Sequence, residues 1–160
     1  MRAKLVNEAI KHLSPKSELE LEPMYNQLST TDKFLTGLEH NNEDLVKLAM
    51  SKRETLDQLG NLFLENKPLS VEIDTACHIK KGRIVRDEES DYFIDFLKDH
   101  NIEYTVIQVR GPGGGWPYIE YTGLARDIIQ LVMGPFDTGL TGDERIEDIE
   151  FYIFGDSDDE

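Results

Sequence analysis

The glycine-rich stretch 111–117, GPGGGWP, is the first place where this sequence could do chemistry. Three successive glycines let a backbone approach a ligand closely, or expose amide N–H groups to an anion. The two familiar phosphate loops are excluded, because no Lys-Ser or Lys-Thr pair follows and the stretch joins one expected strand to another. Gly113, Gly114 and Trp116 are therefore candidates for contact with a ligand or a partner. A flexible hairpin connection is the alternative interpretation.

A second group of candidates consists of carboxylates that strand spacing brings to one face. Glu72 and Asp74 are two residues apart, so both point to the same side of a strand and could converge with Glu120. Such groups can do acid–base work or bind a divalent ion. The acidic stretch 137–147 lacks the ligand alternation of an EF-hand. We expect no metal site.

The histidines and the cysteine do not suggest a catalytic site. The four histidines are scattered, and Cys77 and His78, as neighbours on an expected strand, should point to opposite faces. No nucleophile elbow, zinc-ligand spacing or kinase element occurs in the sequence. We therefore expect no catalytic residue and no cofactor, and a non-enzymatic protein is favoured.

Positioning these residues requires a sheet, and the sequence predicts one after Pro68. Apolar residues alternate from Leu69 to Ile79, which indicates a strand that is long enough to bend or to fold back through Lys81-Gly82. Asp87–Ser90 supplies a cap for a following helix. The later elements are expected to be strands 103–110 and 118–122, a helix 124–133 and a last strand 149–154.

This order of elements predicts an α+β fold. Strand, helix, strand, strand, helix, strand matches the ferredoxin-like βαββαβ arrangement, an antiparallel sheet with two helices on one face. Helical spacing dominates the chain before Pro68. The expected organisation is a helical N-terminal region 1–67, a ferredoxin-like domain 68–154 and an acidic tail 155–160.

One face of the predicted sheet should be uncovered. If Ile107, Val109, Ile119, Phe151 and Ile153 point toward the helices, their neighbours point away from them. A surface of aromatic and acidic groups suits a cationic or protein partner better than phosphates, and an ordinary solvated face is the alternative. The predicted partner-binding or ligand-binding residues are Tyr104, Gln108, Arg110, Gly113, Gly114, Trp116, Tyr118, Glu120, Glu150 and Tyr152.

The charge balance supports a basic partner. The net charge is -15, and the last thirty residues contain ten acidic residues and one basic residue. Such a field repels nucleic-acid backbones, so direct nucleic-acid binding is not expected. The alternative reading is a solubilising charge with a solvated acidic tail.

Two segments resemble known proteins. Residues 31–53, TDKFLTGLEHNNEDLVKLAMSKR, resemble the helix-turn-helix unit of an ankyrin repeat without its usual T-P-L-H entry. The opening 4–17, KLVNEAIKHLSPKS, is similar to the start of many small accessory proteins of large tailed bacteriophages. The first resemblance implies a helical hairpin. The second implies a viral accessory protein and no activity.

The sequence as a whole favours a non-enzymatic acidic protein that binds a basic protein surface. It would act as a phage accessory, host-takeover or anti-defence factor, and one form of this is a DNA mimic. A small-ligand-binding domain or enzyme with loop 111–117 as a lid is an alternative, and a structural virion component is another. The single Cys77, the lack of a signal peptide and the absence of a long apolar run predict the cytoplasm, of the host if the protein is viral.

Overall fold

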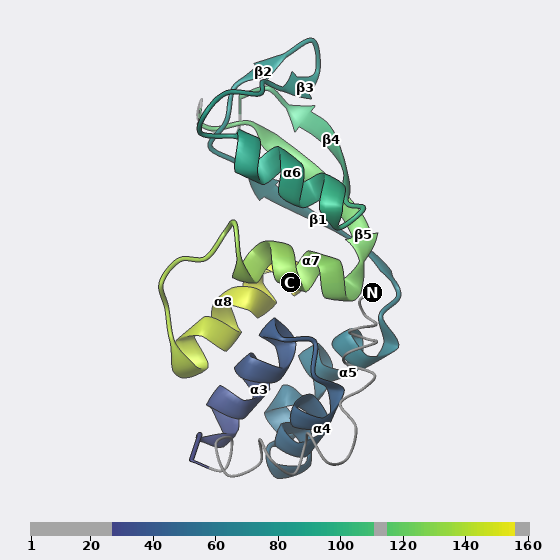
Figure 1. Cartoon of the computed structure of the whole chain (residues 1–160), viewed down its shortest axis with the longest axis vertical. Coiled ribbons are helices and arrows are strands. Elements are labelled where there is room, and N and C mark those ends of the chain that lie inside the picture. Colours follow the sequence, from purple (N-terminus) through teal and green to yellow (C-terminus); the bar gives the residue numbers. More distant parts are fainter. Residues whose placement is uncertain (1–26, 111–114, 156–160) are drawn as a thin grey trace. The chain divides into compact units, whose positions relative to one another are not determined.

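The computed structural model describes residues 27–110 and 115–155 (Figure 1). The chain divides into two compact units, residues 1–60 and 61–160. Helix α5 (Asp57–Glu65) begins in the first unit and ends in the second. The predicted acidic tail 155–160 lies outside the described residues except for Gly155.

The first unit is built around the helix pair α3 (Thr30–Glu39) and α4 (Glu43–Lys52), followed by the short 3-10 helix η2 (Glu54–Leu56). Each α-helix begins at a side-chain cap: Ser29 Oγ accepts from the Asp32 N–H at 3.0 Å, and Asn42 Oδ1 accepts from the Leu45 N–H at 3.2 Å. The helices approach closely, since a Cβ on Gly37 would lie 2.8 Å from a Val46 methyl group. A helix pair is thus present at 31–53, and its likeness to an ankyrin repeat stays a prediction.

The second unit contains a three-stranded antiparallel sheet in the order β1-β5-β4. The strands are β1 (Pro68–Asp74), β4 (Glu103–Gln108) and β5 (Tyr118–Leu124). Antiparallel pairing on both sides of β5 makes β1 and β4 parallel to each other. Alternate residues of the two better-buried strands form the core face: Val71, Ile73, Ile119 and Tyr121.

A small hairpin follows β1. It consists of β2 (Ile79–Lys80) and β3 (Arg83–Ile84), joined by Lys81 and Gly82 with φ of 54° and 76°. Two consecutive positive φ values are typical of the tight turns that join hairpin strands. The fold-back through Lys81-Gly82 is therefore confirmed, whereas a single strand from Leu69 to Ile79 is wrong, because β1 ends at Asp74.

Two helices cover the core face of the sheet, as the sequence predicts. Helix α6 (Asp91–Asp99) brings Phe93 against Tyr121, with ring centroids 5.9 Å apart at an edge-to-face angle of 87°. Helix α7 (Ala125–Met133) buries Ile128 and Ile129 completely. Figure 1 shows α6 lying across the sheet.

The predicted last strand 149–154 is wrong, because these residues belong to helix α8 (Gly142–Phe154). Residues four apart, such as Ile149 and Ile153, satisfy a period of two and a period of 3.6 equally well. Asp143 and Glu144 in the first turn favour the helix, because negative charge stabilises a helix N-terminus. The α+β class is confirmed. The ferredoxin-like topology is not confirmed, since the described residues supply three strands to the sheet and a helix where the fourth was expected.

The predicted orientation of β4 is wrong at Tyr104, whereas Gln108, which pairs with Tyr118, lies on the face opposite the core face as predicted. Pairing with β5 aligns Tyr104 with Tyr121 and Val106 with Ile119, so Tyr104 and Val106 belong to the helix-covered face. The register shifts between Val106 and Gln108, and Ile107 is 45% exposed. Val109, also expected to point inward, is 59% exposed. An inserted residue reverses the alternation locally, and the sequence carries no marker of it.

The buried hydroxyl of Tyr121 provides a test of this core. Thr75 donates to the Ile73 carbonyl at 3.1 Å, so its oxygen accepts from Tyr121, 2.6 Å away. Tyr121→Phe should lower the free energy of unfolding by about 1 kcal/mol in a urea titration. The matched control is Tyr92→Phe on the exposed side of α6. Equal stabilities of the two variants would contradict this packing.

Candidate functional site

A groove runs along β1, with the sheet on one side and the end of α8 on the other. We call it the acidic groove. Its volume is about 650 Å³. It is lined by residues 70–74 of β1, by Tyr118 and Glu120 of β5, and by residues 151–155 at the end of α8 and just beyond it. Three segments that are far apart in the sequence thus form one surface.

The register between β1 and β5 concentrates negative charge in this groove. Glu72 lies directly opposite Glu120, and Asp74 lies opposite Tyr118. Paired residues on neighbouring strands share a face, so all four side chains are on the side of the sheet opposite the core face. Like charges directly opposite one another destabilise a sheet, and a cation bound between them would relieve that repulsion.

The carboxylates also change the behaviour of the tyrosines beside them. Burial raises the pKa of Tyr118 above its ordinary value, and the charge of Glu72, a hydrogen bond to Glu72 and the charge of Asp74 raise it further. Burial, followed by the charges of Asp148 and Asp74, raises the pKa of Tyr152. Both hydroxyls therefore stay protonated at neutral pH and can donate hydrogen bonds.

The far wall of the acidic groove is aromatic. Tyr152 is held by a ring contact with Phe136, at a centroid distance of 6.2 Å. Its neighbours Phe151 and Phe154 are 57% and 39% exposed. Half-exposed aromatic rings beside carboxylates resemble the anchor residues of protein interfaces.

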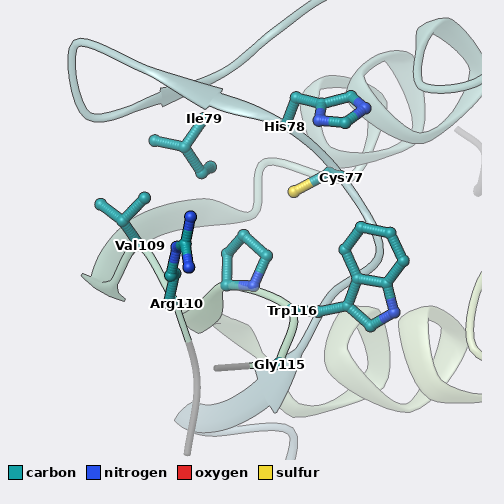
Figure 2. Close-up of a pocket in the computed structure, with 8 residues that line it drawn as sticks. Cys77, His78, Ile79, Val109, Arg110, Gly115 and Trp116 are labelled. Atoms are coloured by element: carbon teal, nitrogen blue, oxygen red, sulfur yellow. The ribbon is translucent and has the colours of Figure 1, made fainter. Parts of the chain in front are cut away.

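A second hollow of about 490 Å³ lies beside residues 115–117, just before the start of β5 (Figure 2). Cys77 and Trp116 line one side of it, and Ile79 and Val109 line the other, as Figure 2 shows. Trp116 is 53% exposed. We call this region the tryptophan hollow.

The surroundings of the cysteine in the tryptophan hollow disfavour ionisation of its thiol. Burial, followed by the charge of Asp87, raises the pKa of the Cys77 thiol, which disfavours the reactive thiolate. The expectation that Cys77 and His78 belong to a strand is wrong, because they lie in the connection between β1 and β2. Both residues line the hollow, Cys77 as a buried residue and His78 as an exposed one.

The structure separates the predicted site residues into two groups. Tyr118, Glu120 and Tyr152 line the acidic groove, and Arg110 and Trp116 line the tryptophan hollow. Gln108 lies exposed at the end of β4 and lines neither. The remaining loop candidates, Gly113 and Gly114, are outside the described residues.

Tyr104 and Glu150 do not lie on the uncovered sheet face where they were predicted. Tyr104 lies on the helix-covered face, where its hydroxyl accepts from the Ile84 N–H at 3.0 Å and its ring lies 4.8 Å from the Arg83 guanidinium carbon. Glu150 belongs to α8 and does not line the acidic groove. The first error follows from assigning the wrong alternation to β4, and the second from assigning a strand to 149–154.

The two phenylalanines of the groove were not among the site residues predicted from the sequence. Phe151 was expected to point into the core, and Phe154 was not singled out. If Ile146, Ile149 and Ile153 are taken as the apolar face of a helix, Phe151 and Phe154 lie outside that buried face. That spacing is the signal that could have found them.

Other kinds of site find no support in the part of the chain that the structure describes. No group of three or more His, Cys, Asp or Glu residues there could hold a metal ion. No described helix is long and apolar enough to cross a membrane. Comparisons with protein-family models, with curated proteins and with solved structures find no match.

The coupling between Glu72 and Tyr118 can be measured. Glu72→Gln removes a neighbouring negative charge, so the pKa of Tyr118 should fall toward the ordinary tyrosine value while burial still holds it above that value. Ultraviolet titration, with Tyr118→Phe to identify the transition, would show the shift. Glu88→Gln at an exposed position outside the groove serves as the control. An unchanged Tyr118 transition in Glu72→Gln would contradict the proposed arrangement.

Proposed function

We propose that this protein is a non-enzymatic interaction protein that binds a basic segment of another protein in the acidic groove. The observation that carries the proposal is the combination, in one groove, of three carboxylates with two half-exposed phenylalanines. The carboxylates attract Lys and Arg side chains. The aromatic rings supply apolar contact and cation–π interactions.

The carboxylates of the groove are not neutralised within the described residues. None of the ion pairs found there involves Glu72, Asp74 or Glu120. Arg86, by contrast, is paired with Asp91 and Asp95 outside the groove. A strongly acidic chain that leaves a compact set of charges unpaired beside apolar rings offers a ready surface for a cationic partner.

The biological setting stays a prediction. The segment that resembles bacteriophage accessory proteins lies outside the described residues. A role as a host-takeover or anti-defence factor, mimicry of DNA and a structural role in a virion are all compatible with a basic partner. Generic protein binding is preferred to mimicry of DNA, because much of the excess negative charge lies in the last thirty residues rather than along an extended surface.

A second candidate function is the binding of a small ligand in the tryptophan hollow. Its volume falls within the roughly 300–1,000 Å³ of ligand pockets, and Trp116 offers an exposed indole. Native mass spectrometry of the purified protein should then show a retained small molecule that Trp116→Ala releases. A spectrum showing only the apoprotein mass, together with Trp116 fluorescence that ignores metabolite mixtures, would contradict this second function.

The leading proposal predicts a charge-specific loss of binding. A synthetic peptide of alternating lysine and valine should bind, and added salt should weaken it. The double variant Glu72→Gln/Asp74→Asn should weaken binding at least about fivefold, since two exposed ion pairs contribute about 1 kcal/mol together.

The matched control for this experiment is Glu88→Gln/Asp99→Asn. It changes the net charge by the same amount at exposed positions outside the groove. Calorimetric titration of both variants with the same peptide separates local recognition from general attraction. Equal losses in the two variants, or no binding to the unmodified protein, would contradict the proposed function.

A further inference from the structure

The backbone of β1 pairs with β5 on one side, and no described strand pairs with it on the other side, where the end of α8 forms the opposite wall of the groove. The Thr75 N–H donates to the Pro117 carbonyl at 2.9 Å, and the Ala125 N–H donates to the Lys67 carbonyl at 2.9 Å. Both bonds fit the same unshifted register as the β1–β5 ladder. In an antiparallel pair only every second residue points its N–H and C=O at the partner strand. Odd-numbered residues of β1 therefore bond to β5, and even-numbered residues point away from it.

The outward-pointing groups of β1 are those of Ser70, Glu72 and Asp74. All three residues are exposed, and β1 has β5 as its only strand neighbour in the described sheet. No backbone hydrogen bond of these three residues to another described segment is found. Pro68, which has no N–H, lies at the start of the strand, as is common on open edges. An edge with free N–H and C=O groups is a template for another strand.

The acidic groove lies along this open edge. Its lining includes every β1 residue from Ser70 to Asp74, together with Phe151 and Phe154. A strand added there would present alternate side chains to the face that carries Glu72 and Asp74. The other side chains would point to the opposite side, which is the side of the sheet that α7 and the core aromatic residues occupy.

We propose that an extended segment of a partner protein, with basic residues alternating with apolar ones, adds to β1 as a fourth strand. This inference rests on the proposed function and specifies its binding mode. Main-chain hydrogen bonds to Ser70, Glu72 and Asp74 supply affinity, and the basic side chains supply specificity by contact with the carboxylates.

The negative charge of the acidic groove favours a basic partner segment over other strands that could pair with β1. Pairing of β1 with β1 of a second copy would bring the Glu72 and Asp74 side chains of both copies onto one face, where they repel each other. Residues 18–22 of this chain, ELELE, also alternate, but their charged positions are acidic and meet the same repulsion. A segment bearing lysine or arginine at alternate positions is the one that the carboxylates attract.

Backbone methylation of the peptide is the direct test. Two versions of the lysine–valine peptide are made, one N-methylated at every lysine and the other at every valine, so that side chains and charge are identical. In an antiparallel addition the lysine amides face β1, and in a parallel addition the valine amides do. One version should lose at least about tenfold in affinity, and the other should bind like the parent peptide.

A substitution in β1 tests the same main-chain hydrogen bonds by changing the protein instead of the peptide. Ser70→Pro removes one N–H that points away from β5 and leaves the hydrogen bonds between β1 and β5 intact. Ser70→Ala is its control, because both substitutions remove the contact between the Ser70 and Thr122 hydroxyls at 2.7 Å. Ser70→Pro should weaken binding several-fold relative to Ser70→Ala, with both variants folded by circular dichroism. If Ser70→Pro does not fold, the methylated peptides still decide.

The outcomes separate the two proposals. Equal binding of both methylated peptides, still weakened by Glu72→Gln/Asp74→Asn, overturns strand addition and leaves the proposed function standing. No binding of the parent peptide overturns both. Loss in one methylated version alone supports strand addition, and the version affected gives the direction of the added strand.

Discussion

The unshifted pairing of β1 with β5 is the constraint on which the rest of the second unit depends. It places Val71 and Ile73 beside Tyr121 and Ile119 on the core face, and it places Glu72 and Asp74 on the other face. A slip of one residue would move the carboxylates under the helices and the apolar side chains into water. The same pairing therefore fixes the core, the location of the negative charge and the side of β1 that is left open.

Much of this arrangement follows from the sequence because β1 and β5 alternate regularly. The helices covering them also have clear apolar stripes, and Lys81-Gly82 marks the hairpin turn. Two features were not predictable in this way. The irregularity between Val106 and Gln108 reverses the faces of β4, and no local sequence signal reveals an inserted residue. The segment 149–154 fits strand and helix patterns alike, so its neighbours in the chain decide its structure.

The acidic and aromatic character of the candidate site could be predicted from the sequence, but the full set of residues that form it could not. The pairing of acidic and aromatic residues on an uncovered sheet face was expected, and Tyr118, Glu120 and Tyr152 do line one groove. Tyr104 was assigned to that face because the alternation of inward and outward residues in β4 was predicted incorrectly. Phe151 and Phe154 were missed because they belong to a helix and not to a strand. Loop 111–117 attracts attention in the sequence, yet Trp116 lies in a separate hollow from the carboxylates. A groove assembled from three distant segments depends on tertiary structure that spacing along the chain does not contain.

The central claim is that a basic segment of a partner binds along the open edge of β1. Amide chemical-shift mapping with the lysine–valine peptide tests it most directly, because it reports on the non-proline backbone amides of the intact protein at once. The predicted result is that the largest shifts fall on residues 70–74 and 151–155. Shifts that centre on Trp116 and Cys77, or that spread over all acidic surfaces without preference, would contradict the claim.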